Sequence, residues 1–146
     1  MVKEREERRR RDREWQLHKA ATIARKSKRL WEEVSGCLQN DVSAFNEKLS
    51  NNATRQFRIR LSDHLVISRE FYPSVNLKVS LNVLDGCIEY KKATRRDSNC
   101  SHMRSAGRFG LDLTDSGQLY IMDSEGSAIS CEEASQSLLS PIFSLC

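Results

Sequence analysis

The chain has 146 residues, of which 38% are hydrophobic and 30% are charged, and its formal net charge at pH 7 is +4. This length fits one domain with an extension, and a hydrophobic fraction below the globular average predicts a small core. The sequence contains no apolar run of about 18 residues or more, which excludes a transmembrane helix.

Positive charge is concentrated at the start of the chain. Residues 1–30 carry 12 Lys and Arg against 5 Asp and Glu, a balance of +7. Residues 31–146 carry 12 against 15, a balance of −3. We therefore predict two parts: a basic, charged helical extension at residues 1–29 and a single α+β domain at residues 30–146.

The start of the chain and the cysteine count bear on location. The first residues form a charge run without the apolar segment of a secretory signal. The five cysteines are an odd number and include no CxxC pair, which favours free thiols over a disulfide framework. Both features predict a reduced, cytoplasmic protein.

Residues 3–29 contain no Gly or Pro and carry acid-before-base pairs four residues apart. The pairs are Glu4 with Arg8, Glu6 with Arg10, and Glu7 with Arg11. Each such pair stabilises an exposed helix by only about 0.2–0.5 kcal/mol. Because large apolar residues are few here, the segment is predicted to be either a solvated helix or an arm that becomes helical against a partner.

A different helical pattern covers residues 30–50. Its apolar residues advance by three or four positions: Leu30, Trp31, Val34, Leu38, Val42, Phe45 and Leu49. This spacing places them in one stripe along the helix, with charged residues on the other side. The helix is therefore predicted to pack over one face of the sheet.

The clearest strand signal lies at residues 75–83, where five aliphatic residues alternate with four polar ones. Alternate side chains of a strand point to opposite faces, so this strand has one buried and one water-facing side. Weaker alternation elsewhere in residues 55–130 predicts a curved antiparallel meander of about six or seven strands. The fold class is thus α+β: a long N-terminal helix on one face of this sheet, followed by a short C-terminal helix.

That C-terminal helix is predicted at residues 131–140. Ser130, with Glu133 three residues later, has the form of a capping box. Pro141 is expected to follow the end of the helix. The apolar residues of this segment are expected to close one end of the core.

The turn residues predict strand register. Asp85-Gly86 suits a two-residue hairpin, which sets Leu81 opposite Tyr90. Taking 115–117 and 124–126 as three-residue loops with a left-handed Gly sets Leu111 and Ile129 each opposite Ile121.

One long connection is predicted, from Ala93 to Gly107. The segment is polar throughout, and loops of such length are usually functional or disordered. Its composition favours disorder.

The sequence offers no constellation for catalysis, a cofactor or a metal. Cys100 and His102 provide two metal ligands in one segment, whereas zinc requires three or four. The three histidines lie in polar positions apart from one another, and no Gly-rich phosphate loop precedes a helix. Neither enzyme activity, a cofactor nor a metal is expected.

The water-facing side of the sheet was also considered as a platform for single-stranded nucleic acid. Such platforms stack bases on exposed aromatic side chains. Tyr120 is the one aromatic residue among fourteen expected on this side. A plain solvated surface is therefore the expectation for it.

The remaining hypothesis is a small non-catalytic binding module that acts through the N-terminal helix, by protein–protein or self-association. Trp15 suits such a contact because tryptophan is enriched at interface hot spots. The alternative is nucleic-acid binding by the same basic arm. The candidate contacts for either partner are Arg8, Arg9, Arg10, Arg11, Arg13, Trp15, Arg25, Lys26, Lys28 and Arg29. No membrane partner is expected, and a small apolar ligand between helix and sheet is neither supported nor excluded.

Overall fold

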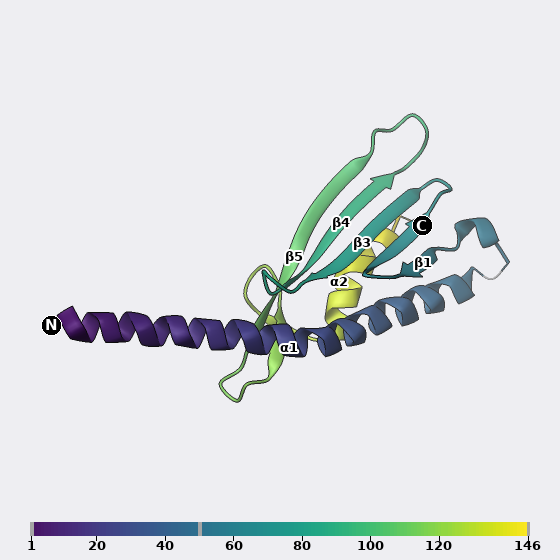
Figure 1. The fold of residues 1–146 in the computed structure, drawn as a ribbon. Coiled ribbons are helices and arrows are strands. Elements are labelled where there is room, and N and C mark those ends of the chain that lie inside the picture. The colour runs from purple at the N-terminus through teal and green to yellow at the C-terminus, as the bar shows by residue number, and fades with distance from the viewer. Residues whose placement is uncertain (1, 50, 146) are drawn as a thin grey trace.

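The computed structural model describes residues 2–49 and 51–145 and shows the predicted α+β fold (Figure 1). A long helix, α1 (Val2–Lys48), leads through the short 3-10 helix η1 (Ala53–Arg55) into a sheet. The strands are β1 (Arg58–Leu61), β2 (His64–Arg69), β3 (Ser74–Asn82), β4 (Cys87–Arg95), β5 (Met103–Leu113), β6 (Leu119–Met122) and β7 (Ala128–Ile129). The last element is the helix α2 (Cys131–Phe143).

The sheet is an antiparallel meander in which the strands lie in sequence order, β1 to β7. The alternation that predicted β3 is realised: Leu77 and Val79 are fully buried, whereas Asn76 and Lys78, each of which precedes one of them, are exposed. One face of the sheet is therefore apolar. It must be covered by another layer, because a sheet with both faces in water does not bury enough apolar surface to be stable.

Both helices cover that apolar face and share one core. Val34, Leu38 and Val42 of α1 are buried in the same cluster as Leu138 and Leu139 of α2. The two helices pack against each other as well as against the strands. The apolar residues of the C-terminal segment are part of the core, as the sequence predicted, and α2 lies alongside α1.

The N-terminal end of α2 matches the prediction, and the C-terminal end does not. The capping box is present: the Ser130 hydroxyl accepts from the Glu133 amide at 3.1 Å, and the Glu133 carboxylate accepts from the Ser130 amide at 3.4 Å. The helix does not stop before Pro141 but continues to Phe143. Phe143 stacks on Phe45 of α1 with 4.1 Å between ring centroids, a contact that offsets the backbone bond lost at proline.

The predicted two-residue turn between β3 and β4 is wrong. Leu81 lies opposite Ile88, not Tyr90, because the loop has four residues, 83–86. The Asn82 side chain closes this loop by accepting from the Asp85 amide at 3.1 Å and donating to its carboxylate at 2.9 Å. The shift is by two residues, so each strand keeps the same inward face, although Val83 leaves the strand and is 45% exposed in the loop.

The two three-residue loops are confirmed. Gly117 and Gly126 both adopt φ of 83°, in the left-handed region that this loop type requires. The register follows: Leu111 and Ile129 both lie opposite Ile121.

The predicted disordered connection at residues 93–107 is wrong. β4 and β5 remain paired as far as Thr94 and Met103, so the loop spans only residues 96–102. Backbone hydrogen bonds hold the ribbon together, and they do not require apolar side chains. The Arg95 side chain closes the loop by donating to the carbonyls of Ser98 and Cys100, both at 2.8 Å.

Arg69 takes an inward position in β2 and is 5% exposed. Its guanidinium donates to the carbonyls of Arg55, Phe71 and Tyr72 at 3.2–3.4 Å. It also lies over the Phe57 ring at 5.6 Å. The buried charge is thus accommodated by carbonyl dipoles and an aromatic face.

Candidate functional site

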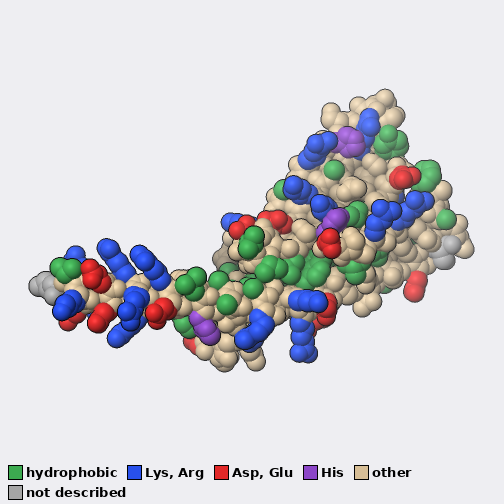
Figure 2. All heavy atoms as spheres, in the orientation of Figure 1, with side chains coloured by type: hydrophobic (Ala, Val, Ile, Leu, Met, Phe, Trp, Pro, Cys, Tyr) green, Lys and Arg blue, Asp and Glu red, His purple; other side chains and the backbone are tan. Residues whose placement is uncertain are grey.

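The first turns of α1 stand free of the domain. Every residue from 2 to 18 is exposed, and contact with the domain begins with Lys19. We call residues 2–18 the arm. It carries seven Lys and Arg against five Asp and Glu, and Figure 2 shows the two signs intermingled along it. The surplus of the arm itself is therefore only +2.

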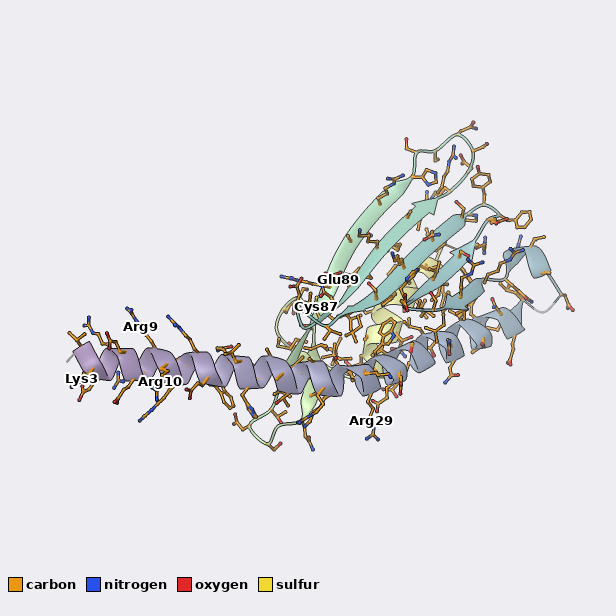
Figure 3. All side chains as sticks on the ribbon, in the orientation of Figure 1. Lys3, Arg9, Arg10, Arg29, Cys87 and Glu89 are labelled. Carbon is orange, nitrogen blue, oxygen red and sulfur yellow. The ribbon has the colours of Figure 1, made fainter. Side chains whose placement is uncertain are left out.

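The predicted arginines do not converge on one spot. Figure 3 labels Arg9, Arg10 and Arg29, whose side chains project from separate parts of the α1 surface. Arg10 pairs with Glu14 at 3.7 Å, and Arg29 pairs with Glu33 at 3.8 Å. The predicted cationic contacts other than Lys26 are all exposed and are spread along α1. They are Arg8, Arg9, Arg10, Arg11, Arg13, Arg25, Lys28 and Arg29.

Lys26 differs from these residues because it is used within the molecule. Its ammonium donates to the carbonyl of Gly117 in the β5–β6 loop. This bond ties α1 to the hairpin and occupies a side chain that was predicted to contact a partner.

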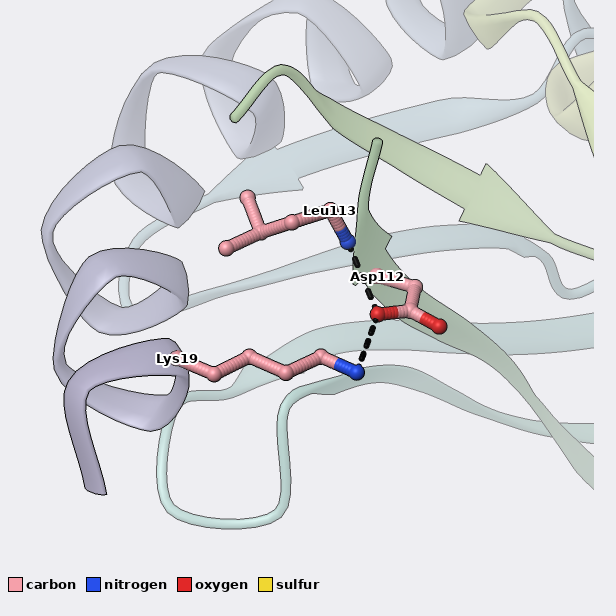
Figure 4. Close-up of polar contacts among 3 residues, drawn as sticks. All are labelled: Lys19, Asp112 and Leu113. Atoms are coloured by element: carbon pink, nitrogen blue, oxygen red, sulfur yellow. Dashed lines mark hydrogen bonds and ion pairs between the residues drawn. The ribbon is translucent and has the colours of Figure 1, made fainter. Parts of the chain in front are cut away.

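A second tie lies about two turns closer to the arm (Figure 4). The Lys19 ammonium and the Leu113 amide both donate to the same oxygen of Asp112, at 2.7 and 2.8 Å. The bond from Lys19, followed by the bond from the Leu113 backbone, lowers the pKa of the Asp112 carboxyl below its usual value. The root of the arm is therefore fixed to β5 by an ion pair.

Trp15 lies directly beyond this root and is 60% exposed. With 3.6 residues per turn, Trp15 and the buried Thr22 lie on the same side of α1, whereas Leu17 points to the opposite side. The indole and the His18 imidazole, 6.3 Å apart, form one wall of an open cleft of about 450 Å³. The rest of its lining includes the Lys19–Asp112 pair and the 114–117 loop.

The sequence did not point to the hydrophobic residues of the β3–β4 loop. Leu84 is 98% exposed and Val83 is 45% exposed. The loop borders α1, since a Cβ on Gly86 would meet Ile23 at 3.7 Å. A two-residue turn at Asp85-Gly86 would place Leu84 at the end of the strand, whereas the four-residue loop exposes it. Asn and Asp side chains favour turns because they hydrogen-bond the nearby backbone. The three-residue spacing of Asn82 and Asp85 was therefore the available signal for the longer loop.

The arm projects past the ends of the neighbouring strands, and we call the region between the arm and these strand ends the corner. Its exposed aromatic member is Trp15 from the arm, which lines the cleft beside the β5–β6 loop. Figure 2 shows hydrophobic side chains gathered along the line where α1 meets the sheet. The corner thus combines exposed apolar groups with a charged, hydrogen-bonded rim, as protein interfaces do.

The cysteines near α1 show no activation as nucleophiles. Burial and then the Glu33 carboxylate raise the pKa of the Cys131 thiol to about 11. Burial also raises the pKa of Cys37, with the Glu132 carboxylate as the next cause. Raised pKa values keep thiols protonated and unreactive at neutral pH.

Within residues 2–49 and 51–145, no three His, Cys, Asp or Glu side chains converge in a way that would hold a metal ion. In the same ranges, no helix combines the length and apolar character needed to cross a membrane. Comparison with protein-family models, with curated proteins and with solved structures finds no match to this chain.

Proposed function

We propose that this protein is a non-catalytic binding module that holds another protein in the corner, with Trp15 as the anchor. The observation that carries the proposal is the position of Trp15. It is 60% exposed on the domain-facing side of a helix that has already left the domain. A large aromatic side chain in this position is covered only in part by its own chain and is available to a partner.

The rigid attachment of the arm supports the same proposal. An isolated helix as short as the arm is marginal in water, but here it continues a helix that the core holds. The Lys19–Asp112 and Lys26–Gly117 bonds fix its direction at the root. Trp15 is therefore presented in a set orientation, which lowers the entropy lost on binding.

The mixed charge of the arm favours a protein partner over a phosphate backbone. Seven cations and five anions are mixed along residues 2–18, whereas phosphate contacts benefit from a continuous positive surface. Mixed charges suit the polar rim of a protein interface. A second copy of the chain is one such partner.

Site-specific photo-crosslinking tests the proposal, with a benzophenone amino acid placed at position 15 or, as a matched control, at position 17. Leu17 is 70% exposed and faces away from the corner. We expect crosslinking to a defined protein from position 15 and little from position 17. Excess wild type or Leu17→Ala should compete for the partner, and Trp15→Ala should not.

The outcome separates the kinds of partner. A product of twice the chain mass, with a dimer seen by sedimentation at micromolar concentration, identifies a second copy. A product of another mass identifies a different protein. Equal crosslinking from both positions, or competition by Trp15→Ala, would overturn the proposal.

A further inference from the structure

The outward face of the sheet carries a second surface that the corner does not include. Besides Arg108, which lies opposite Glu89, five exposed cations point away from the core there: Arg58, Arg60, Lys78, Lys91 and Arg104. We call them the basic face. Figure 2 looks onto this side of the sheet and shows several Lys and Arg side chains spread over it, with few acidic ones between them.

Strand register places these cations in two rows across the strands. In one row, Arg60 faces Val66, Val66 faces Lys78, and Lys78 faces Lys91. In the next row, the same pairing leads from Arg58 on β1 to Arg104 on β5. Four strand spacings of about 4.8 Å separate the ends of this row by about 19 Å.

The positive charge on this face has no internal compensation. Lys78 and Lys91 lie directly opposite each other, an arrangement of like charges that destabilises a sheet. The acids on this side of β3–β5 are engaged elsewhere: Glu89 lies opposite Arg108 and accepts from Asn82 at 3.0 Å, and Asp112 pairs with Lys19. None of the three ion pairs found among the described residues involves a cation of the basic face.

The surface between the cations is hollow. An open depression of about 470 Å³ is lined by Lys78, Lys91 and Arg104, with Asn76, Ala93 and Ala106 among its other residues. These small side chains let a ligand approach the sheet while the longer cationic side chains reach around it. A tetrahedral phosphate can be contacted by several of them at once.

From this geometry we infer that the basic face binds the phosphate backbone of a nucleic acid without regard to base sequence. Sequence independence follows because none of the residues that line the depression is aromatic, so none can stack on a base there. A protein partner is less suited, because interface centres are enriched in aromatics and depleted in lysine. A membrane surface is less suited as well, since the apolar side chains among these cations are the small Val66, Ala93 and Ala106, and none is large enough to enter the lipid.

The inference goes beyond the proposed function, because it concerns a different surface and a different class of partner. It also differs from binding by the basic arm. Two variants that each remove four positive charges distinguish them. The face variant is Arg58, Lys78, Lys91 and Arg104→Ala, and the matched arm variant is Arg8, Arg9, Arg10 and Arg11→Ala.

Fluorescence polarisation with a labelled 20-nucleotide oligonucleotide, single-stranded and duplex, provides the test. For about five phosphate contacts, log K should fall with log salt with a slope of about −3.5 for the single strand and about −4.5 for the duplex. We expect the face variant to lose at least tenfold in affinity, and the arm variant less than threefold. All replaced side chains are exposed, so circular dichroism should show that both variants are folded.

Three results would overturn the inference. The first is absence of binding by the wild type at 50 mM salt. The second is an equal or larger loss in the arm variant, which would assign the contact to the arm. The third is equal binding of poly-glutamate, which would show no preference for phosphate. If the face variant does not fold, Lys78→Gln with Lys91→Gln tests the same depression with two neutral, polar replacements.

Discussion

The two parts of α1 form one continuous helix but are stabilised in different ways. From Lys19 onward the helix buries residues such as Val34 and Leu38 against the sheet and α2. Residues 2–18 bury nothing, and their helical state rests on backbone propensity, on i,i+4 pairs and on continuity with the part that is packed. A single helix can therefore extend beyond the part that packs on the domain. The side chains of the extended part, the arm, remain available for binding.

The largest expected difference between the two parts is in core stability. Leu38→Ala empties a position that is fully buried and should lower the free energy of unfolding by about 2–5 kcal/mol. Leu17→Ala, at a position that is 70% exposed, should change it by less than about 0.5 kcal/mol. Urea unfolding of both variants measures the contrast. A large loss for Leu17→Ala would show that the arm packs on the domain.

A helix-breaking substitution sharpens the comparison in the arm itself. Arg9→Pro removes a backbone donor and costs the local helix about 3 kcal/mol, so the turns before residue 9 should unwind. The far-UV circular dichroism at 222 nm should fall, whereas the midpoint of thermal unfolding should stay within about 1 °C because the core loses nothing. A lowered midpoint would contradict the independence of the arm.

The ion pair at the root predicts a smaller, pH-dependent effect. The folded pKa of Asp112 lies below that of the unfolded chain, where Asp titrates at about 3.9. Its stabilising contribution is therefore complete above that pH and is lost as pH falls through the folded pKa. Asp112→Asn should lower the free energy of unfolding at pH 7 by about 1 kcal/mol. It should also make the further loss of stability below about pH 4 smaller than in the wild type. Asp115→Asn in the neighbouring loop serves as the control and should leave the decline unchanged.

The smallest effect concerns the thiol between the helices. Glu33→Gln removes the second cause of the raised pKa of Cys131 and leaves burial, which is the first. Alkylation of Cys131 by iodoacetamide at pH 8 should become faster, though by less than about tenfold, the equivalent of one pKa unit. The exposed Cys100 provides a reference within the same molecule. Unchanged alkylation of Cys131 would show that burial alone controls it.

Much of the architecture was predictable because it depends on local patterns. The alternation at β3 and the period of Leu38 and Val42 in α1 determine which side chains face the core. Gly117 and Gly126 determine their loops because the left-handed conformation they adopt is costly for other residues. Such signals act within a few residues and do not depend on the rest of the fold.

The features at the surfaces were decided by long-range contacts. The β4–β5 ribbon forms from polar residues because strand pairing uses backbone groups, so no side-chain pattern marks it. The exposure of Leu84 depends on a loop length that the Asn82 side chain sets. The rows of the basic face exist only because register aligns cations from four separate strands.

The sequence by itself therefore determined the helices, the meander and the inward face, since each follows from the local period of apolar side chains. Only the tertiary structure decided where α1 leaves the domain, how far β4 and β5 stay paired, and which charges meet on the sheet. Those features depend on distances between residues far apart in the chain, and local periodicity carries no information about them.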